Sequence, residues 1–161
     1  MSVARLKDFL DSYCIRYIVI SHSVAYTAQG IAALAHIPGK ELAKTVIVKI
    51  DGALAMAVVP ASSQVDLPLL RAATGAKSVE LAAEMEFRTS FPDCETGAMP
   101  PFGNLYGMPI FADTSLAQDE EIAFNAGTHR ELFRMRWADY AGLVHPRVLQ
   151  LATPGAARQA A

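Results

Sequence analysis

The segment Ala43–Pro60, AKTVIVKIDGALAMAVVP, decides the fold of this chain. It contains two apolar runs rich in strand-forming residues, joined by Asp51-Gly52. An Asp-Gly pair suits the two-residue turn of a β-hairpin, because both positions tolerate a positive φ. We therefore predict an antiparallel hairpin over residues 43–60.

The sequence before the hairpin predicts a helix, a strand and a second helix. Apolar residues at helical spacing indicate that the first helix packs one face inward; they are Val3, Leu6, Leu10 and Tyr13. Cys14 follows this pattern and is interpreted as a core residue. A strand over Tyr17–Ser21 comes next, and then a helix over Ala28–Ile37, which Thr27 caps and which ends before Pro38-Gly39.

The sequence after the hairpin alternates short strands and short helices. Asp66 and Pro68 predict the start of a helix that Gly75 ends. The elements predicted beyond it are a strand at 78–81, a helix at 82–87, strands at 108–113, 121–125 and 131–137, and a helix at 138–144. The predicted strands are too many for the predicted helices to connect them all as parallel neighbours. We therefore expect an α+β fold with a mixed, largely antiparallel sheet flanked by helices.

Length and composition point to one globular domain. The chain has 161 residues, of which 52% are hydrophobic and 19% charged, with a formal net charge of −2. We assign residues 1–150 to one domain and expect a disordered tail over 151–161. The balanced charge argues against composition-driven disorder and against a wholesale polyanion-binding surface, so any contact with nucleic acid must be local.

The N-terminus and the cysteines indicate a cytoplasmic protein. The first ten residues, MSVARLKDFL, contain no apolar stretch long enough for a signal peptide or a membrane helix. The chain has two cysteines, Cys14 and Cys94, and no CxxC motif, so we expect no structural disulfide.

Lys44 lies at the start of the hairpin in an otherwise aliphatic row. Strand alternation places Lys44 on the same face as Val46, Val48 and Ile50. Its ammonium either extends past the strand end into solvent or lines a pocket, where it can meet an anionic or carbonyl oxygen. The pattern leaves both interpretations open.

The loop from Gly97 to Gly103 is dense in glycine and proline. Glycine allows close approach of the backbone, and proline fixes φ, so the segment suits a rigid wall beside a small substrate. An ordered connection between two elements is the alternative. The residues between the two glycines are Ala98, Met99, Pro100, Pro101 and Phe102.

A predicted turn after the strand 121–125 also offers polar groups. Asn125-Ala126-Gly127-Thr128-His129 supplies backbone amides, a hydroxyl and an imidazole that can donate a hydrogen bond or relay a proton. On the strand that follows, Arg130, Arg134 and Arg136 share one face. These arginines either contact phosphates or form a solvated outer face.

The common hydrolase and nucleotide-binding signatures are missing from the sequence. There is no GxSxG, HExxH, P-loop or GxGxxG motif, and the histidines and cysteines lack the spacing of metal ligands. We therefore expect neither a metal nor an organic cofactor. A hydrolase with this sequence would also lack a conventional nucleophile.

Taken in order, these motifs resemble the YbaK and prolyl-tRNA-synthetase-associated domain family. The resemblance is carried by Lys44-Thr45-Val46-Ile47, by the GxxxP loop Gly97–Pro101, by Phe111-Ala112-Asp113 and by Phe124–Gly127. It spans about Val3 to Leu149. It implies a free-standing α+β editing domain that hydrolyses the ester between a wrong small amino acid and the 3′ end of a tRNA, commonly proline tRNA.

The resemblance also implies roles for the motif residues. Lys44 is the residue most associated with activity, the GxxxP loop borders the aminoacyl pocket, and backbone amides near Gly97 or Gly127 face the developing oxyanion. Our catalytic candidates are Lys44, Gly97 and His129, and His129 is given only a supporting role because the family pattern does not place it. The substrate-binding candidates are Val46, Ala98, Met99, Pro100, Pro101, Phe102, Gly103, Asn125, Gly127 and Thr128, with Arg130, Arg134 and Arg136 as tRNA contacts.

The residues leave the substrate and the class of protein partly open. The run Glu121–Gly127 is similar to members that remove Ala, Ser or Thr, rather than to the founding type that is associated with Cys. The partners expected are aminoacyl-tRNA, with proline tRNA first, and prolyl-tRNA synthetase. The alternatives are a non-catalytic module that binds tRNA or a synthetase, and an esterase or amidase that acts on small molecules.

Overall fold

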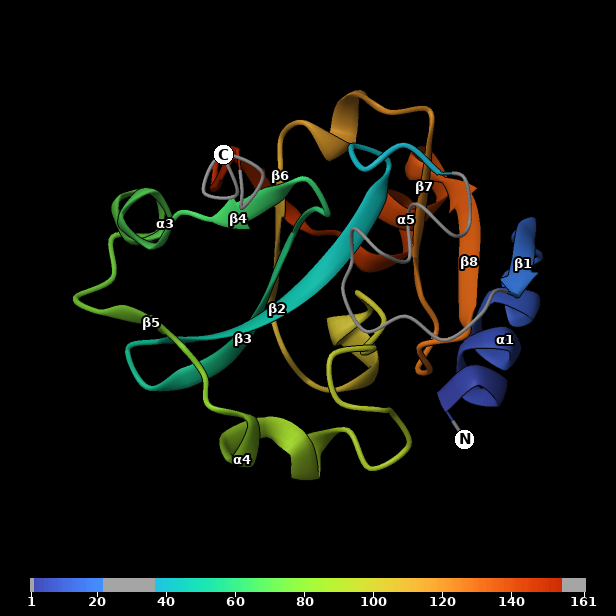
Figure 1. Cartoon of the computed structure of the whole chain (residues 1–161), viewed down its shortest axis with the longest axis horizontal. Coiled ribbons are helices and arrows are strands. Elements are labelled where there is room, and N and C mark those ends of the chain that lie inside the picture. The colour runs from blue at the N-terminus through green and yellow to red at the C-terminus, as the bar shows by residue number, and fades with distance from the viewer. Residues whose placement is uncertain (1, 22–36, 155–161) are drawn as a thin grey trace.

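One long mixed sheet organises the molecule. The computed structural model describes residues 2–21 and 37–154. In this part of the chain the main sheet has eight strands, seven of them in the order β1-β8-β7-β2-β3-β6-β9, with β5 paired to β2 (Figure 1). Five strand pairs, including β4–β10 in a second small sheet, are antiparallel. Three pairs, β2–β7, β3–β6 and β6–β9, are parallel. The predicted α+β fold with a largely antiparallel mixed sheet is confirmed.

The hairpin that the sequence predicts lies at the centre of this sheet. β2 (Leu42–Ile50) and β3 (Ala53–Pro60) pair in register from Ala43–Pro60 to Ile50–Ala53. Asp51 and Gly52 both have positive φ values, 50° and 86°, as the tight turn requires. Lys44 is thereby fixed opposite Val59.

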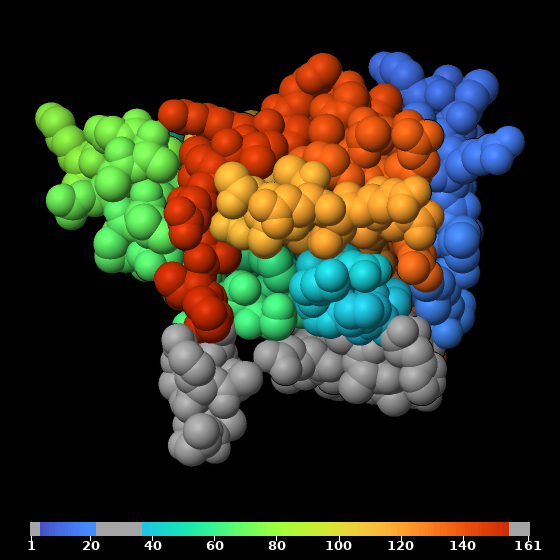
Figure 2. All heavy atoms as spheres, turned by 90° about the horizontal axis from the view of Figure 1, so that it is seen from above, coloured from blue at the N-terminus to red at the C-terminus, as the bar shows by residue number. Residues whose placement is uncertain are grey.

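The remaining strands extend the sheet on both sides of the hairpin. They are β1 (Tyr17–Ser21), β5 (Val79–Leu81), β6 (Ile110–Asp113), β7 (Glu121–Asn125), β8 (Glu131–Arg136) and β9 (Arg147–Leu149), while β4 (Ser63–Val65) and β10 (Ala152–Pro154) form the second sheet. Figure 2 shows the blue N-terminal segment along one edge of the molecule, next to the orange segment that contains β8.

Helices cover the two faces of the main sheet. α1 (Ser2–Ser12) and α5 (Trp137–Val144) pack on one face, where Leu10 and Tyr140 join the largest apolar cluster. α3 (Leu67–Thr74) packs through Leu70 on the other face. Short helical segments, α4 (Glu84–Phe87) and the 3-10 turns at 88–90, 103–105 and 116–118, connect the strands. No helix in the described ranges is long and apolar enough to cross a membrane.

The residues that predicted the start and the end of α3 cap this helix in the structure. The carboxylate of Asp66 accepts a hydrogen bond from the Leu69 N–H at 3.0 Å, and Gly75 ends α3 with a φ of 71°. α1 ends at Ser12, one residue before the predicted Tyr13. The chain then turns through Cys14, whose φ is 56°. The inward orientation predicted for Tyr13 and the core position predicted for Cys14 are therefore wrong: both are exposed.

The end of the chain also differs from expectation. Leu151 is fully buried, and residues 152–154 form β10, so the prediction of a disordered tail is wrong for 151–154. The carboxylate of Asp113 accepts hydrogen bonds from the N–H groups of Leu151 and Ala152, at 3.0 Å each. The predicted helix at 28–37 and the tail from residue 155 lie almost wholly outside the described residues.

Candidate active site

Lys44 is half-buried on the face of the sheet opposite α1 and α5. Its antiparallel partner, Val59, belongs to the apolar cluster around Leu70 on that face. No hydrogen bond or ion pair joins its ammonium to another residue in the described part of the chain. Burial lowers the pKa of Lys44, because the charged form loses hydration. A cation held in this way is available to a negatively charged or carbonyl oxygen.

Asn125 lies beside Lys44 on the neighbouring strand. Ala43 is the parallel partner of Phe124, so the next residues, Lys44 and Asn125, are neighbours on the same face. The side chain of Asn125 is buried, and its Oδ1 accepts no hydrogen bond from the described residues. A buried amide oxygen without a partner is costly, so it is a natural place for a donor on a bound molecule.

The GxxxP loop packs directly against the turn that follows Asn125. The Gly127 N–H donates to the Ala98 carbonyl at 2.9 Å, and the Glu95 N–H donates to the Gly127 carbonyl at 2.8 Å. Gly97 and Gly127 have φ values of 85° and 106°, which a side chain would strain. The structure therefore brings together two segments that lie about thirty residues apart.

His129 forms hydrogen bonds with the two residues that precede the GxxxP loop. Its backbone N–H donates to the Glu95 carboxylate, and its ring Nε2 lies 2.8 Å from the carbonyl oxygen of Thr96. A carbonyl only accepts, so Nε2 carries the proton in this contact. His129 is buried and contacts the position where a Cβ on Gly97 would lie. In this geometry His129 connects the turn after β7 to the residues at the start of the loop.

The GxxxP loop exposes its first glycine and buries the rest. Gly97 is exposed, whereas the residues from 98 to 103 are buried. The buried Tyr140 hydroxyl donates to the Pro101 carbonyl at 2.6 Å, which fixes the far end of the loop. No hydrogen bond between described residues uses the N–H of Gly97 or Met99. These amides are candidates for stabilising an oxyanion.

Some of the residues that were predicted to line one pocket lie in different apolar clusters. Phe102 is fully buried and packs edge-on against Phe124 and Tyr140. Met99 belongs to that same cluster, whereas Val46 packs on the opposite face of the sheet. Gly103 has a packing role, because a Cβ there would lie 2.4 Å from the Met108 carbonyl oxygen.

The three predicted tRNA-contact arginines occupy different surroundings. Arg134 pairs with Glu121 at 3.2 Å and with Glu41 at 3.9 Å. Arg136 is exposed at the end of β8. Arg130 is exposed in the turn before β8, where its N–H donates to the Thr128 hydroxyl at 3.3 Å. Thr128 therefore serves the turn.

The site contains polar residues that sequence reasoning missed. Glu95 and Tyr140 hold the two ends of the GxxxP loop, but their partners lie 34 and 39 residues away, and no local pattern indicates such pairs. Among the described residues no group of three or more His, Cys, Asp or Glu side chains is arranged to hold a metal ion. The arrangement offers a cation and backbone donors, which suit hydrolysis of an activated ester by positioned water.

Comparisons with known proteins bear on the family and the fold of this chain. The family model of the aminoacyl-tRNA editing domain matches residues 22–143. A Ser/Thr-tRNA deacylase from Escherichia coli K12, named ProXp-y, is 26% identical over 150 residues, which cover 90% of this chain and 89% of that protein. A crystal structure described as a candidate trans-editing enzyme for prolyl-tRNA synthetase superposes with a TM-score of 0.80. It is 21% identical, over 94% of this chain and 97% of that one. A hypothetical protein of known structure gives a TM-score of 0.83 at 16% identity, over 92% and 99% of the two chains.

Proposed function

Because this chain belongs to the aminoacyl-tRNA editing domain family, we propose that it frees tRNA from a wrongly attached small amino acid, Ala, Ser, Thr or Cys. The enzyme is an aminoacyl-tRNA deacylase, an ester hydrolase of the trans-editing type. Proline tRNA is the first substrate to test, and prolyl-tRNA synthetase is the proposed partner. The 26% identity to a Ser/Thr-tRNA deacylase favours Ser and Thr among the four amino acids.

One observation carries the proposal: a half-buried ammonium on β2, which has no partner among the described residues, lies next to the buried amide of Asn125. The 3′-terminal ribose and the ester oxygens of a charged tRNA would supply the acceptors and donors that these two groups lack. Lys44 would thus anchor the end of the substrate. The exposed backbone at Gly97 belongs to the loop that contacts the turn after Asn125, and it would face the scissile carbonyl.

The reaction needs no nucleophile from the protein. Water attacks the ester carbonyl, the N–H groups of Gly97 and Met99 stabilise the oxyanion, and the ribose oxygen leaves with a proton from the neighbouring hydroxyl or from water. Such donors are worth several kcal/mol when they are fixed in advance, on the order of 3 kcal/mol for one donor. His129 would contribute by holding Gly97 in place.

A deacylation panel tests the proposal. The full chain would be incubated with proline tRNA charged with Ala, Ser, Thr, Cys or Pro, and with correctly charged Ser- and Thr-tRNA. We expect ester loss well above the buffer rate for Ser- and Thr-charged proline tRNA, and none for the Pro-charged form. No loss on any substrate, with tRNA binding intact, would identify a non-catalytic tRNA-binding module instead.

The same panel separates the proposed enzyme from a general esterase. A small-molecule esterase would cleave free serine methyl ester at a rate comparable to that of charged tRNA. The deacylase should prefer charged tRNA by orders of magnitude in kcat/KM, because binding of the tRNA end orients the ester.

A further inference from the structure

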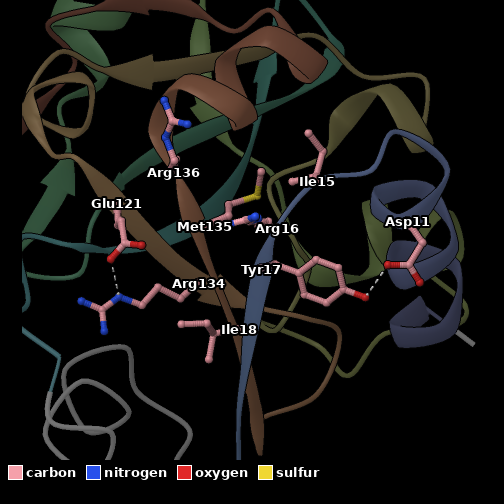
Figure 3. A pocket seen from close by; sticks show the side chains of 9 residues that line it. All are labelled: Asp11, Ile15, Arg16, Tyr17, Ile18, Glu121, Arg134, Met135 and Arg136. Atoms are coloured by element: carbon pink, nitrogen blue, oxygen red, sulfur yellow. Dashed lines mark hydrogen bonds and ion pairs between the residues drawn. The ribbon is translucent and has the colours of Figure 1, made fainter.

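A groove of about 790 Å³ lies at the edge of the sheet, away from the candidate active site. It forms where the chain leaves α1 and enters β1, along the ends of β1 and β8 (Figure 3). Its lining residues are Asp11, Ile15, Arg16, Tyr17, Ile18, Glu121, Arg134, Met135 and Arg136.

Two of the three arginines in this groove have no acidic partner among the described residues. Arg134 pairs with Glu121, and the Asp11 carboxylate accepts the Tyr17 hydroxyl at 2.9 Å. Figure 3 shows both contacts as dashed lines, and no such line reaches Arg16 or Arg136. The two acidic side chains that line the groove are therefore already engaged.

Arg16 immediately precedes β1, and Arg136 is the last residue of β8. Tyr17 pairs with Met135 in the antiparallel register of β1 and β8, and this register continued by one residue places Arg16 opposite Arg136, with both lining the groove. Like charges in this position repel each other. An anion between two guanidinium groups removes the repulsion, and the planar fork of arginine fits a phosphate with paired hydrogen bonds.

Arg136 lies on the face of the sheet that carries Lys44. Arg136 alternates with Met135 and shares its face with Leu132, the strand partner of Asn125. Two strand spacings and four residues along β8 separate Lys44 from Arg136, roughly 16 Å at the usual strand dimensions. A nucleic-acid strand that ends at Lys44 would need to extend by only a few nucleotides to reach the groove.

We infer that Arg16 and Arg136 form a phosphate clamp for the acceptor arm of the tRNA whose 3′ end binds at Lys44. The inference rests on the proposed deacylase function for the identity of the nucleic acid. Ile18, which is largely exposed beside the clamp, offers apolar surface to a sugar. Arg134 lines the groove but is paired with carboxylates, and Arg130 is not among the lining residues.

The test compares the wild-type chain with the double variant Arg16→Ala/Arg136→Ala. Binding of an uncharged tRNA is measured by fluorescence anisotropy over a series of KCl concentrations. Each lost phosphate contact should reduce the slope of log affinity against log salt by about 1, so we expect a slope shallower by about 2. At low salt the Kd should rise by about tenfold or more, whereas hydrolysis of 3′-seryl adenosine, which lacks phosphates, should be unchanged.

Two control variants sharpen the comparison. Arg71→Ala removes an exposed arginine from α3 and should leave the slope unchanged. The double variant Arg16→Lys/Arg136→Lys keeps both charges and should keep most of the slope. Melting curves check that each variant is folded.

The outcomes separate the clamp from the catalytic proposal. An unchanged salt slope in the folded alanine double variant, or no tRNA binding by the wild type, overturns the clamp even if the enzyme hydrolyses charged tRNA. A shallower slope in a protein that hydrolyses no charged tRNA supports the clamp and refutes the deacylase proposal.

Discussion

At the scale of the residue, the burial of Lys44 lowers the stability of the folded protein but suits its proposed role in binding substrate. Its ammonium is half-buried without an acidic partner in the described residues, so the folded state bears a desolvation cost that an exposed lysine would not. The sequence indicated an unusual lysine at the start of an aliphatic row. Its burial follows from the strands that pair on both sides of β2, and these pairings are long-range.

Replacing Lys44 by methionine should therefore not destabilise the protein. Methionine keeps the apolar stem and removes the charge, so we expect the Tm of Lys44→Met at neutral pH to equal or exceed that of the wild type. The pKa of Lys44 is lowered on folding, so the wild type bears the cost below that pKa and loses it as the pH rises toward the unfolded value. The Tm difference should therefore shrink in alkaline buffer.

Lys49 on the same strand provides the matched control. It pairs with Glu80 and Glu86 at 3.0 and 2.6 Å, and these contacts raise its pKa. The stabilisation from Lys49 is complete below its unfolded pKa and is lost as the pH rises through the folded value. Lys49→Met should thus lower the Tm slightly at neutral pH. A clear loss of stability in Lys44→Met but not in Lys49→Met would contradict this description of the site.

His129 should act as a positioning residue. Removing it in His129→Ala leaves the Thr96 carbonyl without its donor and frees the Gly97 loop, at about 1–2 kcal/mol in the free energy of unfolding. We expect kcat to fall with little change in KM, and His129→Gln, which keeps an N–H donor, to restore part of the rate. If the glutamine variant is as inactive as the alanine variant, the imidazole has a direct chemical role instead.

At the scale of the element, the GxxxP loop depends on backbone conformation more than on side chains. Glycine and proline spacing predicted a rigid loop, and the hydrogen bonds from Gly127 and Tyr140 explain its rigidity. The spacing did not predict that Phe102 turns into the core, because the loop pattern does not encode which side chains meet α5. The contact between the loop and residues 125–129 is equally non-local.

Two glycine variants with similar backbone strain test whether deacylation depends on the backbone of the loop. Gly97→Ala and Gly75→Ala each place an alanine at a positive φ, 85° and 71°, at a cost of about 1–2 kcal/mol. A Cβ at Gly97 also meets the His129 ring at 3.6 Å, whereas a Cβ at Gly75 meets nothing within 4 Å. We expect similar shifts in urea midpoint but a large loss of deacylation for Gly97→Ala alone. Equal activity in the two variants would exclude a special role for the loop backbone.

At the scale of the whole molecule, local sequence signals predicted the central sheet well, but they did not predict the long-range contacts that order the C-terminal segment 151–154. The Asp51-Gly52 turn and the Asp66 cap act within a few residues, so their spacing is readable in the sequence. The segment 151–154 lacks apolar periodicity and was therefore expected to be disordered. It is ordered because the carboxylate of Asp113, about forty residues earlier, accepts hydrogen bonds from its backbone N–H groups. The spacing of apolar residues does not indicate a hydrogen bond between such distant residues.

Asp113 should accordingly be a major stabilising residue without a role in catalysis. Asp113→Ala removes the acceptor for Leu151 and Ala152, and we expect a loss of about 2–4 kcal/mol in unfolding free energy from urea titration. Ser115→Ala, which loses only its hydroxyl bond to the same carboxylate, should cost less. Native-state hydrogen exchange should show early loss of protection in β10. Retained protection there would indicate that Leu151 burial alone orders the segment.

Deacylation by this fold should depend on Lys44, and the effect of removing its charge on the rate tests this most directly. The rate of ester loss from Ser-charged proline tRNA would be compared among the wild type, Lys44→Met and Lys49→Met, with melting curves recorded for all three. We predict a loss of at least about a hundredfold for Lys44→Met, on the order of 3 kcal/mol in transition-state stabilisation, with no loss of Tm and a normal rate for Lys49→Met. A wild-type rate in folded Lys44→Met would contradict the claim.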